Sequence, residues 1–135
     1  MTARTLAKKA ASFALSKKAY DIVLLDLRSL TSAADFFVIC SADSDTQVRA
    51  IADAVRDESE KIGARVWHDE GYQASSWIIL DFVDVVVHVF HKESRHYYNL
   101  ERLWGDAPRI EVGDDGETKT EPKRPKARKR TKSQE

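Results

Sequence analysis

The apolar residues of this chain recur with two different periods, and each period predicts a different kind of element. Near the N-terminus, apolar residues from Leu6 to Ala14 lie at helical spacing with lysines opposite, which predicts an amphipathic helix over about residues 3–18. The runs DIVLLDL, residues 21–27, and DFFVICS, residues 35–41, are rich in branched and aromatic residues. They predict two strands that are covered on both faces, or nearly so.

The middle of the chain carries the clearest helix signal. Ser44 and Gln47 fit a capping box, in which each side chain binds the free backbone N–H of the other residue. Apolar residues then follow along one face up to Ile62, and Gly63 is typical of a helix end. ARVWH, residues 64–68, predicts a short strand.

The most apolar run, WIILDFVDVVVHVF over residues 77–90, follows a loop predicted over residues 69–76. Its density of β-branched residues favours two strands over a helix, and Val83–Asp84 at its middle makes it a hairpin. SRHYYNLERLW, residues 94–104, then predicts a helix with Tyr97, Leu100 and Trp104 on one face.

This order of elements predicts a single domain over residues 1–108 of α/β class (α+β type), with a mixed sheet of about five strands packed with helices. Residues 109–135 contain too few apolar side chains to offset the entropy of ordering, and we expect them to form a disordered basic tail.

Charge divides the chain in the same way. Residues 114–135 contain eight Lys/Arg and five Asp/Glu, about +3, whereas residues 1–113 contain 14 basic and 17 acidic groups, about −3. The lone Cys40 excludes an internal disulfide framework and is expected to be a buried apolar group. The N-terminal segment lacks the apolar block of a secretory signal, and no run is suited to span a bilayer. A cytoplasmic protein is expected.

Candidate catalytic and metal-binding groups have simpler interpretations. Asp81 and Asp84 could hold magnesium, but a turn role for Asp84 and a solvent-facing or neighbour-facing Asp81 explain both better. Asp43 and Asp45 spell the D-x-D pattern of nucleotide-transferring enzymes, yet they flank the predicted helix cap rather than lie on a strand. The histidine spacing does not match a zinc site, and no Gly-rich phosphate loop occurs. We expect no enzyme, metal or cofactor.

The second half of the chain is rich in Tyr, Trp and Arg, the types favoured at interface hot spots. Packing of the hairpin against the last helix explains the same residues. That interpretation places Trp104 in the core, and both interpretations stay open for Trp77 and Tyr98. The set comprises Tyr72, Trp77, Tyr97, Tyr98, Trp104, Arg95 and Arg102.

The segment WIILDFVDVVVHVFHKESRHYYNLERLWGDA resembles the hallmark segment of the ribosomal silencing factor family, also called RsfS or iojap. The family pattern runs Trp, three apolar residues, Asp, an aromatic residue, Gly, Asp, an apolar strand with His, then Glu-Ser-Arg, Tyr, Leu-Glu and Leu-Trp. The matching positions are Trp77, Asp81, Phe82, Asp84, His88, Glu93, Ser94, Arg95, Tyr98, Leu100, Glu101, Leu103 and Trp104. The resemblance covers about residues 3–107. Val83 stands where the family usually has Gly, which predicts a different turn there.

The resemblance implies a fold similar to nucleotidyltransferases without their active site, and a translational repressor rather than an enzyme. Family members bind the large ribosomal subunit through ribosomal protein fourteen, at the face that meets the small subunit, and block subunit joining when nutrients are short. Free members are often homodimers. The partner-binding residues expected here are Tyr72, Trp77, Asp81, Asp84, His88, Arg95 and Tyr98.

Within that set, we expect Asp81 and Asp84 to face a basic patch of the ribosomal protein, with Trp77 as an apolar anchor. The basic tail either contacts ribosomal RNA without sequence preference or only aids solubility. Two alternatives to repression stay open. One is an assembly factor that binds the same site on immature large subunits, and the other is a nucleotidyltransferase-like enzyme that uses Asp43 and Asp45 with magnesium.

Overall fold

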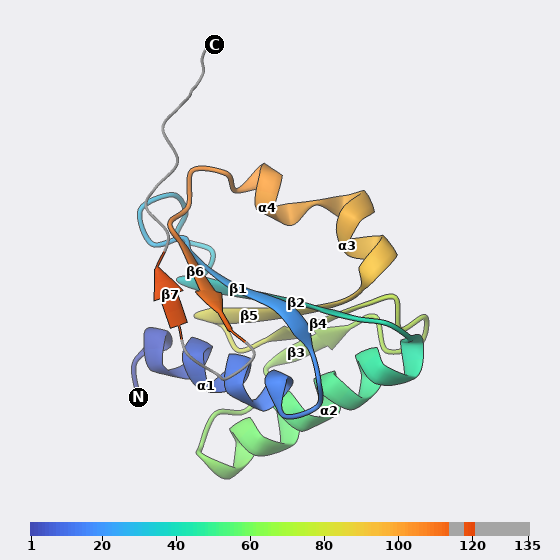
Figure 1. The fold of residues 1–135 in the computed structure, drawn as a ribbon. Helices are drawn as coiled ribbons and strands as arrows, with labels where there is room; N and C mark the ends of the chain where they lie inside the picture. Colours follow the sequence, from blue (N-terminus) through green and yellow to red (C-terminus); the bar gives the residue numbers. More distant parts are fainter. Residues whose placement is uncertain (114–117, 121–135) are drawn as a thin grey trace.

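The computed structural model describes residues 1–113 and 118–120, which form a seven-stranded mixed sheet with helices on both faces (Figure 1). The elements in chain order are α1 (Ala3–Leu15), β1 (Tyr20–Asp26), β2 (Phe36–Ala42), α2 (Asp45–Lys61), β3 (His68–Glu70), β4 (Trp77–Asp81), β5 (Val85–His91), α3 (Lys92–Tyr98), α4 (Leu100–Leu103), β6 (Arg109–Val112) and β7 (Thr118–Thr120). The strand order is β3-β4-β5-β2-β1-β6-β7. Of the described pairings, β2–β5 is parallel and the others are antiparallel. The expected α+β class is confirmed.

The main core lies between the sheet and the helices α1 and α2. On β2, Phe36, Val38 and Cys40 point into this core, while the alternate residues point to the other face. Helix α1 contributes mostly alanines to the contact, and such small side chains let a helix lie close to its neighbours. Cys40 is fully buried as expected, and burial raises the pKa of its thiol to about 12.

The start of α2 confirms half of the predicted capping box. The Ser44 hydroxyl accepts a hydrogen bond from the backbone N–H of Gln47, at 3.1 Å. The Gln47 side chain does not return the bond to Ser44: its carbonyl accepts from the N–H of Asp43 at 2.9 Å, and its amide donates to the carbonyl of Lys18 at 3.2 Å. Gln47 therefore ties the N-terminus of α2 to the α1–β1 turn.

The last predicted helix is two short helices. Asn99 between them has a left-handed φ of 47°, a conformation that asparagine tolerates better than most residues, and its side chain accepts from the N–H of Arg102. The break turns Tyr97 away from Leu100 and Trp104, so Tyr97 is 80% exposed and its predicted packing is wrong. Leu100 and Trp104 do pack against the sheet.

Two predicted boundaries are corrected by strand pairing. The strand expected over 64–68 begins only at His68, because pairing with β4 runs from His68 to Glu70. Its charged sequence does not predict a strand, but charged residues are typical of a sheet edge. The domain does not end at Pro108: β6 pairs with β1, and β7 pairs with β6. The rest of the predicted tail, residues 114–117 and 121–135, lies outside the described residues.

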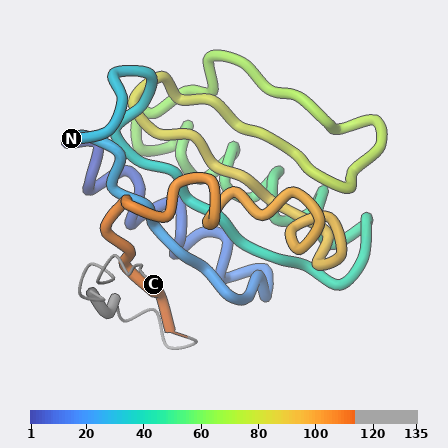
Figure 2. Tube along the Cα trace, turned by 90° about the horizontal axis from the view of Figure 1, so that it is seen from above, coloured from blue at the N-terminus to red at the C-terminus, as the bar shows by residue number. Residues whose placement is uncertain are grey.

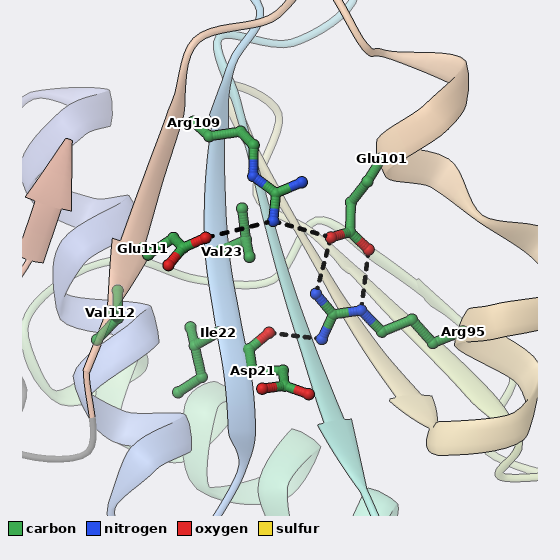
Figure 3. Close-up of a pocket in the computed structure, with 8 residues that line it drawn as sticks. All are labelled: Asp21, Ile22, Val23, Arg95, Glu101, Arg109, Glu111 and Val112. Carbon is green, nitrogen blue, oxygen red and sulfur yellow. Dashed lines mark hydrogen bonds and ion pairs between the residues drawn. The ribbon is translucent and has the colours of Figure 1, made fainter. Parts of the chain in front are cut away.

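Helices α3 and α4 lie on the face of the sheet opposite α1 and α2, which we call the second face (Figure 1). An ionic cluster of Arg95, Glu101 and Arg109, which we call the clamp, holds them there (Figure 3). Arg95 binds the Glu101 carboxylate through two nitrogens, at 2.9 and 3.1 Å, and Arg109 binds it at 3.2 Å. Arg95 also donates to the Ser41 hydroxyl at 2.8 Å and to the carbonyl of Asp21. The clamp thus joins α3 and α4 to β1, β2 and β6, and its side chains are 12% to 23% exposed.

The β4–β5 turn keeps the backbone conformation that favours glycine. Val83 has a φ of 80°, so the different turn expected from its side chain is wrong. The Asp81 carboxylate accepts from the N–H of Val83 at 2.7 Å, and the N–H of Phe82 donates to the carbonyl of Val85 at 2.8 Å. Asp81, rather than the Asp84 side chain, therefore stabilises the turn.

We predict that Val83→Gly raises the free energy of unfolding by about 1 kcal/mol, because a β-branched residue at positive φ is strained and the Val83 side chain, 56% exposed, packs little. Urea unfolding followed by circular dichroism measures the change. Val86→Gly on β5, where the backbone is extended, is the matched control and should lower the stability. A less stable Val83→Gly variant contradicts the strain.

We predict that Glu101→Gln lowers the free energy of unfolding at pH 7 by about 2 kcal/mol, since it weakens a largely buried ionic network. Burial acts to raise the pKa of Glu101, but hydrogen bonds and charge from Arg95 and Arg109 outweigh it, so the pKa is lowered in the folded state. A carboxylate of this kind stabilises the fold above its unfolded pKa and loses that effect as pH falls through its folded pKa.

The difference between wild type and Glu101→Gln should accordingly be constant from neutral pH to about pH 5 and should close below about pH 4. Urea titrations across this range measure it. Glu58→Gln is the control, because Glu58 forms an exposed ion pair with Lys61 at 2.9 Å and should change stability by less than about 0.5 kcal/mol. A difference that stays constant to pH 3 argues against the clamp.

Candidate partner-binding site

Helices α3 and α4 cover only part of the second face and leave the β3–β4 edge of the sheet uncovered (Figure 2). Figure 2 shows the α3–α4 segment, in orange, running over the centre of the sheet, with the β3–β4 hairpin, in green, beyond it. Strand register places Ile79 and Asp81 of β4 on this face, opposite Glu70 and His68 of β3. We call this uncovered area the open strip: His68, Glu70, Ile79, Asp81 and Val86, bounded by Trp77 and Tyr98 at one end and by Val83–Asp84 at the other.

Trp77 lies where the open strip meets α3. Its indole stacks on Phe90, with ring centroids 4.9 Å apart and planes at 23°, and meets Tyr98 at 4.7 Å. Its Nε1–H donates to Nδ1 of His88 at 3.1 Å. Trp77 is half-buried and Tyr98 is 51% exposed, so both reach solvent from a packed aromatic cluster.

His88 lies beneath this cluster and is 5% exposed. Burial lowers the pKa of its imidazole to about 3, so the ring is neutral at physiological pH. Phe37 packs edge-on against it, with ring centroids 4.5 Å apart. A neutral ring beneath Trp77 offers little surface for direct contact with a partner.

The two predicted acidic residues lie at the turn end of the open strip. Asp81 is half-buried and binds the backbone of Val83, whereas Asp84 is exposed. The backbone carbonyl of Asp84 accepts from the N–H groups of Asp35 at 2.7 Å and Phe36 at 3.1 Å, which anchors the turn to β2. The Asp84 carboxylate thus projects from a fixed backbone.

Tyr72 and Arg95, the other predicted residues, lie apart from the open strip. Tyr72 packs against the core on the α2 side, where the Arg56 guanidinium stacks over its ring at 5.2 Å. Burial, together with the charges of Asp53 and Asp69, raises the pKa of its phenol. Arg95 is engaged in the clamp. The predicted set is therefore not one continuous surface: Trp77, Asp81, Asp84 and Tyr98 adjoin the open strip, His88 lies beneath it, and Tyr72 and Arg95 lie elsewhere.

Sequence reasoning missed the β3 contribution to the open strip. Residues 69–76 read as a loop, so Glu70 was assigned no face, and His68 ended a strand of unknown position. Register with β4 now places both beside Ile79 and Asp81. Only the alternation of side chains along a paired strand could have placed His68 and Glu70 on this face. The three polar or charged residues of β3 do not show that alternation in the sequence. Trp67, which precedes them, is 73% exposed.

Two cavities of the described chain are open to solvent and are lined by side chains that already form ion pairs. The pocket of Figure 3, about 390 Å³, lies beside the clamp, and a second of about 300 Å³ lies between α2 and β3, where Arg56 pairs with Asp69. Among the described residues no three His, Cys, Asp or Glu side chains gather as metal ligands do. No helix in the described ranges is long and apolar enough to cross a membrane.

The D-x-D residues do not project together from a strand. The Asp43 carboxylate accepts a hydrogen bond from the Tyr20 hydroxyl at 2.6 Å and lies 3.8 Å from the Lys92 ammonium. Burial and the Asp43 carboxylate raise the pKa of Tyr20 to about 12. Asp45 lies in the first turn of α2, where its charge favours the helix dipole. Both acids thus have structural roles.

Comparison with known proteins gives a consistent result. A family model described as "Ribosomal silencing factor during starvation" matches residues 1–135. The ribosomal silencing factor RsfS of Bacillus subtilis is 46% identical over 108 residues, which span 80% of this chain and 92% of that protein. The chloroplastic protein Iojap of Zea mays is 42% identical over 98 residues, 73% of this chain and 42% of that protein.

Solved structures extend the likeness to the fold. A crystal structure of a protein from Chromobacterium violaceum superposes with a TM-score of 0.76 at 34% identity, covering 78% of this chain and 88% of that one. A second, from Bacillus halodurans, gives a TM-score of 0.64 at 42% identity, covering 75% of this chain and 91% of that one. The resemblance first drawn from the segment after Trp77 is thereby confirmed, and the chain belongs to the ribosomal silencing factor family.

Proposed function

We propose that this chain represses translation in the cytoplasm by binding the large ribosomal subunit through ribosomal protein fourteen and sterically blocking the small subunit. Membership of a family named for ribosomal silencing supports the general role. The observation that carries the specific contact is the open strip, an uncovered sheet face that combines apolar side chains with carboxylates.

The chemistry of the open strip favours a basic protein over RNA. Its formally charged residues are Glu70 and Asp81, the Asp84 carboxylate lies at its end, and no Lys or Arg belongs to it. Carboxylates repel a phosphate backbone, which proteins bind mainly through Lys and Arg. Complementary charge instead steers a basic protein surface to the site and disfavours the surrounding RNA. The half-buried Ile79 and Val86 supply the apolar area that a stable contact needs.

Within this face Trp77 is the anchor and Asp84 the most accessible charge. Trp77 offers a large ring that is already held by Phe90 and Tyr98, so little conformational entropy is lost when a partner covers it. Asp84 is exposed on an anchored turn, and its side chain can pair with a Lys or Arg without disturbing the core. Asp81 contributes charge but is also needed by the turn.

We predict that the purified protein co-sediments with isolated large subunits and not with small subunits, and that its presence reduces joined ribosomes when the missing subunit is added. Asp84→Lys should weaken large-subunit binding by about tenfold or more at low salt, because it places a like charge against a basic partner. Glu58→Lys is the matched control and should bind normally, because the Glu58 side chain is largely exposed on α2, away from the second face.

Each result of this experiment has a separate meaning. Binding without loss of joined ribosomes favours the assembly-factor alternative. Absence of binding to either subunit overturns the proposal, and nucleotide binding that Asp43→Ala removes would then support the enzyme alternative. Normal binding by Asp84→Lys would mean that the β4–β5 turn does not contact the partner. Sedimentation velocity of the free protein shows whether the binding unit is the homodimer that the family resemblance implies.

We further propose that the basic C-terminal residues add a salt-sensitive contact to ribosomal RNA. The test must spare β6 and β7, because a chain cut at Pro108 loses a strand whose Ile110 and Val112 are buried. A chain ending at Thr120 keeps the sheet and removes seven of the eight Lys/Arg that lie beyond residue 113. We predict that it binds more weakly than the full chain at low salt and with a shallower salt dependence. Equal affinities across a salt series contradict this contact.

A further inference from the structure

His88 is a polar side chain set into an apolar row of the second face. Strand register places Ile79 of β4 on one side of it and Ile39 of β2 on the other. With Phe37 packed against its ring and 5% of its surface exposed, it occupies a position suited to Leu, Ile or Phe.

The hydrogen bond with Trp77 fixes the state of the imidazole. An indole Nε1–H can only donate, so the Nδ1 of His88, 3.1 Å away, must accept and carries no proton. The neutral ring then has its proton on Nε2. Among the described residues this buried Nε2 has no hydrogen-bond partner. The packing that buries His88 therefore leaves one of its two polar atoms unsatisfied.

An unsatisfied buried donor lowers the stability of the fold, a cost that a phenylalanine at the same position would avoid. A phenylalanine could not, however, accept the hydrogen bond that Nδ1 of His88 accepts from Trp77. Stacking on Phe90 restrains the tilt of the Trp77 indole, but a stacking contact is less directional than a hydrogen bond and restrains rotation within the ring plane less. A directional bond to an atom of a buried ring does restrain that rotation.

We propose that His88 is a positioning residue that holds the Trp77 indole in one orientation at the edge of the open strip, ready for a basic protein partner. The inference rests on the proposed function, since it takes Trp77 as the anchor. It replaces the expectation that His88 itself touches the partner. Pre-organisation of a large aromatic ring raises affinity by lowering the entropy lost on binding.

A double-mutant cycle tests the proposal. His88→Phe keeps the ring and removes the acceptor, His88→Asn keeps an acceptor near the Nδ1 position, and Trp77→Phe removes the donor. We expect His88→Phe to weaken large-subunit binding by about five- to tenfold and His88→Asn to recover part of that loss. In the Trp77→Phe background His88→Phe should have little further effect on binding, because the bond is already absent.

Two further measurements separate positioning from folding and from the function itself. Urea unfolding of each variant gives its folded fraction, and the indole N–H resonance of Trp77 in the free protein should shift in His88→Phe and return toward the wild-type value in His88→Asn. A cycle with Trp67→Phe, whose ring is 73% exposed and contacts His68 rather than His88, is the matched control and should show no coupling with His88→Phe.

The outcomes differ for the two proposals. If Trp77→Ala weakens binding but a fully folded His88→Phe binds normally, the positioning role is overturned while the proposed binding face stands. If the effects of His88→Phe and Trp77→Phe on binding simply add, His88 acts independently and the inference is likewise wrong. If Trp77→Ala leaves binding to the large subunit unchanged, the anchor and the inference fall together.

Discussion

The parallel pairing of β2 with β5 is the constraint on which the rest of the fold depends. Adjacent parallel strands cannot be joined by a tight turn, so the chain between them must leave the sheet and return. It does so through α2, which covers the first face, and through the β3–β4 hairpin, which extends the sheet beyond β5. The parallel pair thereby places β3 and β4 at one edge and β1, β6 and β7 toward the other.

The same constraint explains why one part of the second face is bare. From the end of β5 the chain must reach β6, which lies on the far side of β2 and β1. The α3–α4 segment therefore crosses the centre of the sheet and has no reason to pass over β3 and β4. Because these two helices are short, packing alone holds them weakly, and the charged clamp of Arg95, Glu101 and Arg109 supplies directional contacts. The open strip is thus a consequence of the topology.

The sequence predicted elements whose signals are local. The Ser44 cap, the apolar face of α2 and the hairpin centred on Val83–Asp84 need no knowledge of distant residues, and all three are present. β6 could not be predicted, since Ile110 and Val112 form a strand only because β1 offers an open edge. The break at Asn99 was hidden by a helical spacing that continues through it. The candidate site divides in the same way: Trp77 and Asp84 could be singled out from the hairpin sequence, but their shared face with Glu70 depends on strand register.

The polar residues in the most apolar run of the chain have three different physical roles. Asp81 binds the N–H of Val83 and so helps to hold a valine in a conformation that favours glycine. Asp84 contributes its backbone to β2 and leaves its carboxylate exposed. Nδ1 of His88 accepts a hydrogen bond from the indole N–H of Trp77. A group whose hydrogen-bonding capacity is used within the fold has less to offer a partner. Under the proposed function, recognition through this hairpin would therefore fall mainly to the Asp84 charge and the Trp77 ring, with Asp81 and His88 fixing where those two lie.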